Sequence, residues 1–391
     1  MINFKKTLAV LSSAALLLSC TSCALNMRDT YDKTEEQLLA YNEDEPTLNV
    51  AERVNTLGDS DTESNELGLD NVMGFAPNEP ATTSEVTVVI TGDIKLDEAM
   101  IADAKAQAPE GKDYSFLRMY TGVYRTINDA DIAVGGYSAI GKPYGTDAEY
   151  EPPVEHLDAL SAVGFDLLDI SGAGNNYTLL EEHGISGFSY SDAGDEPFRS
   201  IEKDGLTFTF ASIGGTGCAQ SYKDDALYEN LEFADLPADV LVAIVHWDEE
   251  ITTEEISATS KRLADSGVDV ILGCGDTLGR TETIETEDGG SALVCNSLGN
   301  LLSSSEEGYA LCSGIVSVKL TMTTDIYGDK ITSEISVIPA VTHYAKENKD
   351  YGIYRLADYT DELAQTHGAE VDVDGLTDYV NSKIPAELIA K

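Results

Sequence analysis

Basic residues are scarce in this chain of 391 residues. It contains 24 Lys and Arg residues against 70 Asp and Glu residues, which gives a formal net charge of −46. A surface of this sign repels nucleic acids and anionic lipid headgroups, because both carry dense negative charge. The composition therefore excludes nucleic acid as a partner. Solubility is the simplest explanation of the acidity, and binding of cations or of a basic envelope component is the alternative.

Several signatures of enzymatic chemistry are also missing. The sequence has no Gly-x-Ser-x-Gly elbow and no cysteine beside a histidine, and the Gly-rich segment 214–218 lacks the spacing and the lysine of a phosphate-binding loop. We expect a plain connecting loop there. The cysteines beyond the N-terminal region lack the close spacing of a zinc or redox pair, so we expect free thiols. They are Cys218, Cys274, Cys295 and Cys312.

Long apolar runs are absent except near the N-terminus. Lys5 and Lys6 precede the mostly apolar stretch Thr7–Leu18, which is shorter than the roughly 20 residues that span a bilayer. The segment Leu17–Cys20 (LLSC) looks like a bacterial lipobox, whose cysteine receives the lipid. We therefore expect residues 1–20 to be a lipoprotein signal peptide that anchors the protein outside the cytoplasm through Cys20. An ordinary cleaved signal peptide is the alternative.

Residues 21–84 differ in composition from everything that follows them. Between positions 24 and 84, fourteen acidic residues stand against three basic ones, and apolar residues are few. Such a segment cannot bury enough apolar surface to offset the entropy of ordering. The composition predicts an acidic disordered tether between the anchor and a folded domain.

From Glu85 onward, the pattern predicts an α/β domain over residues 85–356. Apolar strand-like runs alternate with helical spacing in the first part, whereas the last strands follow one another without helices, which predicts an antiparallel portion towards the C-terminus. The acidic tail 357–391 contains one expected helix, Leu376–Lys383. The expected strands are Val86–Gly92, Asp131–Val134, Phe165–Ile170, Leu206–Ser212, Val240–Trp247, Val268–Gly273, Ala292–Asn296, Ile315–Met322 and Ile331–Ile338, and the expected helices are Leu96–Ala108, Pro153–Val163, Thr178–His183 and Glu254–Ser266.

Polar residues follow several of these strands. Asp93 comes after VTVVITG, His246 ends VLVAIVH, and Asp276 and Asn300 follow two later apolar runs. Functional groups in open α/β sheets gather where strands end, and a neutral imidazole at such a position is a good metal ligand. Each signal is weak by itself, since Asp93 serves equally well as a helix cap.

Six segments, in this order, resemble the CapA family of bacterial capsule-synthesis proteins, the poly-γ-glutamate capsule type with a metallophosphatase-like fold. The resemblance covers roughly residues 85–356. It implies an α-β-β-α sandwich with mixed sheets, and it implies an envelope polymer or capsule-synthesis membrane proteins as partners. The segments are Thr91–Ile94 (TGDI), Ala130–Ile132 (ADI), Pro152–Ile170 (containing GFD), Ala243–Glu250 (AIVHWDEE), Ser266–Gly273 (SGVDVILG) and Ser297–Asn300 (SLGN).

The metal ligands that the resemblance implies are only partly present. Asp93 and His246 match ligands of the family's GD and HWG motifs. Ser138 stands at or near the glutamate of its NLE motif, and Asn176 or its neighbour Asn175 keeps the amide of an Asn-His pair without the histidine. The two histidines of the HPH motif are replaced by the residues on either side of Asp276.

The remaining donors are too few for a two-metal hydrolytic site, which draws ligands from several loops. Asp93, His246, Asp276 and Asn176 could hold one divalent cation, and such an oxygen-rich set suits Mn²⁺, Mg²⁺ or Ca²⁺ better than zinc. The number of lost donors favours a domain without a bound metal.

Our leading hypothesis is a CapA-like surface lipoprotein in capsule or cell-envelope polymer synthesis, export or attachment, with a degenerate site that does not hydrolyse. Trp247, Glu250 and Asn300 are candidates to line its cleft. One alternative is a metal-dependent hydrolase of an envelope phosphoester or amide, and another is a structural surface module. The sequence leaves open whether the protein is an enzyme.

Overall fold

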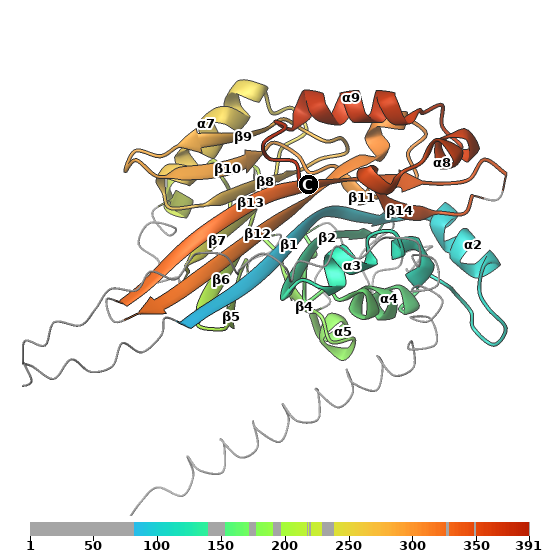
Figure 1. Cartoon of the computed structure of the whole chain (residues 1–391), viewed down its shortest axis with the longest axis horizontal. Helices are drawn as coiled ribbons and strands as arrows, with labels where there is room; N and C mark the ends of the chain where they lie inside the picture. The colour runs from blue at the N-terminus through green and yellow to red at the C-terminus, as the bar shows by residue number, and fades with distance from the viewer. Residues whose placement is uncertain are drawn as a thin grey trace, which may run out of the picture.

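The protein folds into two β-sheets that pack face to face, as the computed structural model shows (Figure 1). The structure describes residues 82–139, 153–171, 177–190, 197–216, 218, 220–228, 238–325, 328–347 and 349–390. The predicted signal peptide with Cys20, nearly all of the predicted tether and Asn176 lie outside the described residues. Among the described residues, no helix has the length and apolar character needed to cross a membrane.

The first sheet has eight strands and is mixed. Its order is β14-β13-β12-β1-β2-β3-β4, with β11 beside β1. The strands from β1 to β4 run parallel, whereas β12, β13 and β14 pair antiparallel, so the antiparallel portion lies towards the C-terminus as predicted. The strands are β1 (Thr82–Leu96), β2 (Ile132–Ala139), β3 (Leu167–Asp169), β4 (Ser186–Phe188), β11 (Asn300–Leu302), β12 (Cys312–Asp325), β13 (Gly328–His343) and β14 (Gly352–Arg355).

The second sheet has six strands in the order β5-β6-β7-β8-β10-β9. The inner strands run parallel, and β5 and β9 pair antiparallel at the two edges. The strands are β5 (Phe198–Lys203), β6 (Leu206–Ile213), β7 (Val240–His246), β8 (Val270–Cys274), β9 (Thr281–Glu285) and β10 (Ser291–Cys295). Because the parallel strands are buried on both faces, they consist of nearly continuous apolar runs.

Helices cover the outer faces of both sheets. Those on the first sheet are α2 (Glu98–Ala106), α3 (Tyr124–Asn128), α4 (Glu155–Val163) and α5 (Tyr177–Glu182), and α7 (Thr253–Asp265) covers the second sheet. Thr252 starts α7 with a capping box, since its hydroxyl accepts from the Glu255 amide while the Glu255 carboxylate accepts from the Thr252 amide. Two helices, α8 (Asp361–Thr366) and α9 (Val373–Lys383), follow near the C-terminus.

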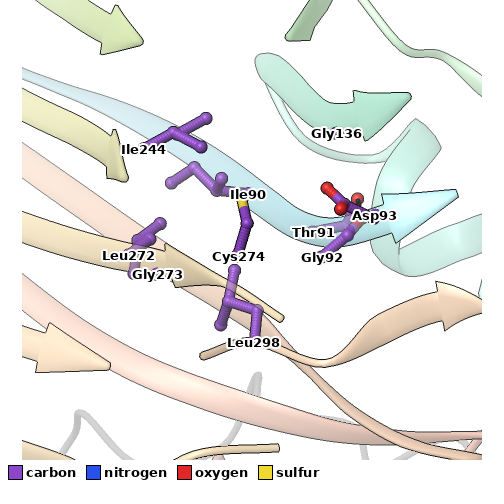
Figure 2. Close-up of a pocket in the computed structure, with 10 residues that line it drawn as sticks. All are labelled: Ile90, Thr91, Gly92, Asp93, Gly136, Ile244, Leu272, Gly273, Cys274 and Leu298. Carbon is purple, nitrogen blue, oxygen red and sulfur yellow. Dashed lines mark hydrogen bonds between the residues drawn. The ribbon is translucent and has the colours of Figure 1, made fainter. Parts of the chain in front are cut away.

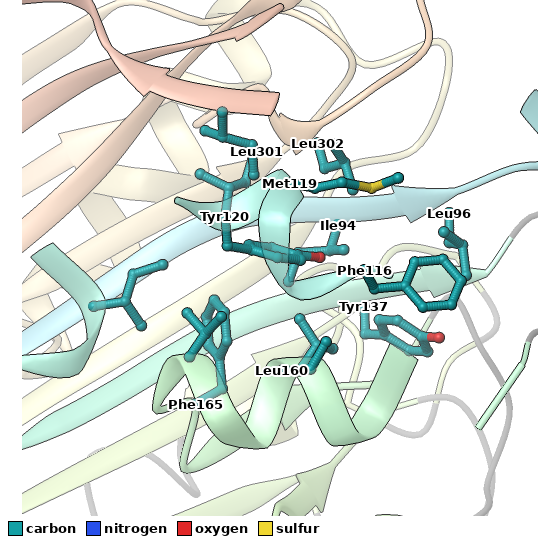
Figure 3. Packing of buried hydrophobic residues seen from close by; sticks show 14 of the residues in the cluster. Ile94, Leu96, Phe116, Met119, Tyr120, Tyr137, Leu160, Phe165, Leu301 and Leu302 are labelled. Carbon is teal, nitrogen blue, oxygen red and sulfur yellow. The ribbon is translucent and has the colours of Figure 1, made fainter. Parts of the chain in front are cut away.

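Three apolar cores hold these layers together. Alternate residues of β1 serve two of them: Val86, Val88 and Ile90 face the second sheet, whereas Val89 faces the helices. Figure 3 shows the helix-facing core, with large side chains such as Tyr120 in close contact. The third core lies between α7 and the second sheet. The α/β class and the α-β-β-α sandwich with mixed sheets are therefore confirmed.

Both ends of the described chain pack onto this sandwich. β1 begins at Thr82, inside the last residues of the predicted tether, because backbone pairing with β12 from Thr82↔Thr324 onward needs no apolar side chain. At the other end, α9 buries Leu376 and Val380, one helical turn apart, against the core between the sheets. This helix includes the predicted Leu376–Lys383.

The strands that the sequence did not predict are short or lie at edges. They are β4, β5, β9, β11 and β14, each with three to six residues. β5 and β9 expose alternate polar residues on edges, so they lack the apolar run that identifies a buried strand. The predicted central strands are all present.

His156 in α4 is a structural residue in the helix-facing core. The imidazole is fully buried, its Nε2 lies 2.8 Å from the Tyr120 hydroxyl, and its Nδ1 lies 3.4 Å from the Tyr137 hydroxyl. Burial lowers the pKa of His156 to about 3. The native state therefore holds this side chain neutral, whereas the unfolded chain protonates it below its ordinary pKa of 6.5.

Acid should consequently destabilise the fold through His156. Its folded pKa lies below its unfolded pKa, so its contribution is complete above pH 6.5 and is lost as the pH falls towards 3. Between pH 7 and 4.5 we expect the free energy of unfolding to fall by about 2–3 kcal/mol through this group. Urea unfolding of His156→Phe should show a smaller decrease, whereas Tyr120→Phe, which retains the imidazole, should keep the full decrease. An equal decrease in His156→Phe would contradict this assignment.

Candidate functional site

The C-terminal ends of parallel strands from both sheets meet at one edge of the sandwich. β1 places Asp93 there and β3 places Asp169, while the second sheet contributes Ser212 from β6, His246 from β7 and Cys274 from β8. The ends of parallel strands are where α/β folds place their functional groups. Two of the residues predicted from the sequence, Asp93 and His246, therefore share this edge.

An ion pair between Asp169 and His246 joins the two sheets. The Nε2 atom of His246 donates to Oδ2 of Asp169 at 2.9 Å. The Asp169 side chain is completely buried, and that of His246 is 17% exposed. The imidazole that the sequence suggested as a metal ligand is therefore directed at a carboxylate of the opposite sheet.

Three further donors complete the environment of Asp169. Oδ1 accepts from the backbone amide of Ser171 at 3.0 Å and from its hydroxyl at 2.6 Å. Oδ2 accepts from the hydroxyl of Ser212 at 2.8 Å, in addition to the bond from His246. Each carboxylate oxygen thus receives two hydrogen bonds, which stabilises the ionised form in a buried position.

These contacts set the charge states of the pair. Burial alone would raise the pKa of Asp169, but the charge and hydrogen bond of His246 and the bonds from Ser171 hold that pKa below its usual value. Burial also opposes the imidazolium, yet the pKa of His246 lies well above 6.5. A thiolate at Cys274 would contribute to that rise. Burial raises the pKa of Cys274 to about 12, so at neutral pH the ionised Asp169 is the group that retains the proton on His246.

Cys274 lies beside this ion pair without being activated by it. Its Sγ is 3.7 Å from Nε2 of His246, the same nitrogen that donates to Asp169. A nucleophilic cysteine requires a depressed pKa, and here burial has the opposite effect. All four cysteines beyond the N-terminal region are free thiols, as predicted.

Asp93 lines a small pocket between the two sheets (Figure 2). Its carboxylate points towards Gly136 of β2, where a Cβ atom would lie 2.0 Å from Oδ1, so only glycine fits. Asp93 is nine-tenths buried, and no side chain or amide among the described residues donates a hydrogen bond to its carboxylate. Burial raises its pKa, although the charge of His246 opposes this rise.

Asp276 is paired with a lysine that the sequence analysis did not single out. The ammonium of Lys95, two residues beyond Asp93 in β1, forms a close ion pair with the Asp276 carboxylate. The Asn300 amide lies 3.4 Å from the same carboxylate. The hydrogen bond from Lys95 lowers the pKa of Asp276. Asp276 and Asn300 thus lie near Asp93, but Lys95 stands among them.

The loop 297–300 (SLGN) owes its place to two glycines. Gly299 has a φ of 68°, a left-handed conformation that glycine adopts without strain. Its carbonyl oxygen would lie 1.9 Å from a Cβ atom at Gly92, so the loop can approach β1 only because Gly92 has no side chain. This approach puts Asn300 in register with Asp93.

The other predicted cleft residues lie at the rim. Trp247 donates from its indole to the Asn296 carbonyl at 2.9 Å and packs edge-on against Tyr222, while Glu250 is exposed before α7. Asp248 accepts from the amide of Thr216 at 3.0 Å and pairs with Lys223. These contacts bind the loop 214–216 to the end of β7.

The donors at this edge do not fit a divalent metal ion. Nε2 of His246 lies 2.9 Å from Oδ2 of Asp169, so this nitrogen is already engaged by a carboxylate. Asp276 is engaged by Lys95. Within the described part of the chain, no group of three or more His, Cys, Asp or Glu side chains is placed to hold an ion. Cationic side chains pair with two of the three carboxylates, those of Asp169 and Asp276.

Two residues central to this edge, Asp169 and Lys95, were not predicted from the sequence. Asp169 is an acid within the apolar run LLDI, which is a signal that it needs a buried partner. Lys95 follows the GD motif by two positions, so strand alternation could have placed it beside Asp93. The partner of Lys95 could not be predicted, because Asp276 is 181 residues away in the chain.

Breaking the cross-sheet pair should be costly. We expect Asp169→Asn and His246→Gln each to lower the free energy of unfolding by about 3 kcal/mol, since each leaves a buried polar partner unsatisfied. The double variant should lose about 1–3 kcal/mol less than the sum. Urea unfolding at several pH values measures this coupling.

The coupling should also depend on pH in a defined direction. Asp169 contributes above its ordinary pKa of 3.8 and loses this contribution in stronger acid, while His246 contributes fully below 6.5 and loses its contribution as the pH rises through its higher folded pKa. The coupling should therefore be greatest between about pH 4 and 6.5. Additive losses at pH 5.5 would contradict the ion pair.

Comparisons with known proteins give distant structural similarity only. No family model matches the chain, and no curated protein matches it. The fold is similar to that of a hypothetical protein from Thermus thermophilus (TM-score 0.41, 16% identity, 64% of this chain and 99% of that chain). It is also similar to a phosphatase from Mycoplasma pneumoniae (TM-score 0.41, 12% identity, 66% and 95%). Vps29 from Chaetomium thermophilum, in complex with a cyclic peptide, gives a TM-score of 0.26 at 9% identity, covering 65% and 96%.

Proposed function

We propose that this protein is a CapA-like surface lipoprotein that works in the synthesis, export or attachment of a cell-envelope polymer without hydrolysing it. Its ordered motifs over residues 85–356 support the family, and its α-β-β-α sandwich is the architecture expected of a metallophosphatase-like domain. The lipobox-like segment ending at Cys20 supports an anchored position outside the cytoplasm.

The orientation of the His246 imidazole towards Asp169 is the observation that supports a site without hydrolytic activity. A histidine that serves a metal ion offers it a nitrogen lone pair. Here Nε2 donates a hydrogen bond to Oδ2 of Asp169, whose other oxygen accepts two hydrogen bonds from Ser171. The imidazole therefore works as a buried cation that neutralises Asp169.

Among the described residues of this edge, Asp93 is the one carboxylate outside an ion pair, and the other titratable groups are unsuited to act as base or nucleophile. The charge and hydrogen bond of Asp169 favour the protonated form of His246, which disfavours this imidazole as a base. The thiol of Cys274 has a pKa of about 12 and remains protonated. The carboxylates of Asp169 and Asp276 are both engaged in ion pairs. What remains is a fixed polar edge suited to binding.

The charge of the protein restricts the kind of contact it makes. With a net charge of −46, the chain repels a polyanion at long range and attracts a basic surface. An anionic polymer would therefore have to be held by short-range contacts, whereas a basic face of a capsule-synthesis membrane protein would be attracted directly. Docking to such a membrane protein is thus the arrangement that the charge favours.

Genetic complementation tests the three parts of this proposal: the role in the envelope, the non-hydrolytic site and the lipid anchor. Deleting the gene in the source bacterium should reduce the amount of envelope polymer on the surface. The wild-type gene and Asp93→Asn should restore it equally, because no turnover depends on this carboxylate and the Asp169–His246 pair stays intact. Cys20→Ala should restore it less well, because it removes the expected anchor.

Three results would overturn the proposal or a part of it. A deletion that leaves the surface polymer unchanged would contradict the role in the envelope and favour a structural module. A failure of Asp93→Asn alone, at wild-type protein levels, would contradict the non-hydrolytic site. Full restoration by Cys20→Ala would contradict the lipid anchor. Immunoblots of each strain provide the control for protein levels.

A further inference from the structure

Lys95 occupies a position of opposite charge within the group Asp93, Asp276 and Asn300, which we call the acidic corner. Ile94 and Leu96 point into the helix-facing core, so Asp93 and Lys95 lie on the other face of β1. Lys95 reaches from there to Asp276, which follows β8 of the second sheet. Its ammonium therefore joins the two sheets, as the Asp169–His246 pair does.

Two oxygen acceptors in the acidic corner lack a donor. Oδ1 of Asn300 is buried and has no hydrogen-bond partner in the described structure, although buried amides are normally satisfied. Asp93, its register partner in the neighbouring strand, receives no hydrogen bond from the described residues either. Together with the carboxylate of Asp276, these atoms form a set of oxygen donors, the kind that hard divalent cations prefer.

The cationic side chains of this edge offset all but one of its carboxylate charges without an added ion. Three carboxylates lie here, on Asp93, Asp169 and Asp276, and two cationic side chains accompany them. The ammonium of Lys95 favours the ionised form of Asp93 against the effect of burial. A divalent cation bound to Asp276 in the acidic corner would have to displace this ammonium or lie beside it, and two positive charges repel each other.

We propose that Lys95 is a built-in substitute for a divalent cation, and that it closes a latent cation site formed by Asp93, Asp276 and Asn300. The resemblance implies a metal here, but the residues present do not fit one. Lys95 is then a cause of this difference, in addition to the lost histidines. This inference concerns the acidic corner alone and holds whether or not the protein acts on an envelope polymer.

Removing the charge of Lys95 should expose the latent site. We expect Lys95→Met to bind Mn²⁺ at least about tenfold more tightly than the wild-type full chain in calorimetry at pH 7.5. Thermal unfolding should show a lower midpoint for this variant in EDTA and recovery on addition of Mn²⁺. The double variant Lys95→Met/Asp93→Asn should lose both the binding and the recovery.

A matched control comes from the same sheet. Lys319 of β12 pairs with Glu85 of β1 at 3.0 Å, away from the acidic corner, so Lys319→Met should leave Mn²⁺ binding unchanged. If Lys95→Met is insoluble, Lys95→Gln removes the same charge and retains a polar end. Unchanged affinity in a folded Lys95 variant would overturn the proposal, as would a gain that survives Asp93→Asn or that appears equally in Lys319→Met.

Discussion

The buried ion pair between Asp169 and His246 determines the arrangement of this edge of the molecule. It connects the end of β3 in one sheet to the end of β7 in the other across 2.9 Å. Ser171 and Ser212 supply the remaining hydrogen bonds, so the ionised Asp169 is stable within an apolar sandwich. This pair engages Nε2 of His246 and fixes the imidazole against a carboxylate of the opposite sheet.

A second ion pair, between Lys95 and Asp276, also connects the two sheets. In both contacts a cationic side chain, Lys95 or His246, neutralises a carboxylate at the end of a strand. The edge thus brings several carboxylates together around positive charge. This charge comes from the side chains of Lys95 and His246. At these two contacts the neutralising charge is supplied by the protein itself.

The sequence predicted the main architecture because buried parallel strands consist of apolar runs that few other structures contain. The strands around Ile90, Val242 and Ile271 were recognisable for this reason. Strand-end positions also identified Asp93 and His246. The sequence could not show which partner each side chain would meet: His246 finds Asp169 77 residues away, and the register that brings Asn300 beside Asp93 depends on the close approach of Gly92 and Gly299. Short edge strands such as β9 form because they pair with a neighbouring strand, so their own sequence pattern does not identify them.

The charge state of His246 is the central claim, and nitrogen NMR of its imidazole tests it most directly. In a long-range ¹H–¹⁵N spectrum of the full chain at pH 7.5, both ring nitrogens should show the chemical shifts of a protonated imidazolium, and an equimolar amount of Zn²⁺ should leave those shifts unchanged. A neutral imidazole at this pH, with a free lone pair on Nε2 that Zn²⁺ then occupies, would contradict the account. It would instead favour a metal-dependent hydrolase.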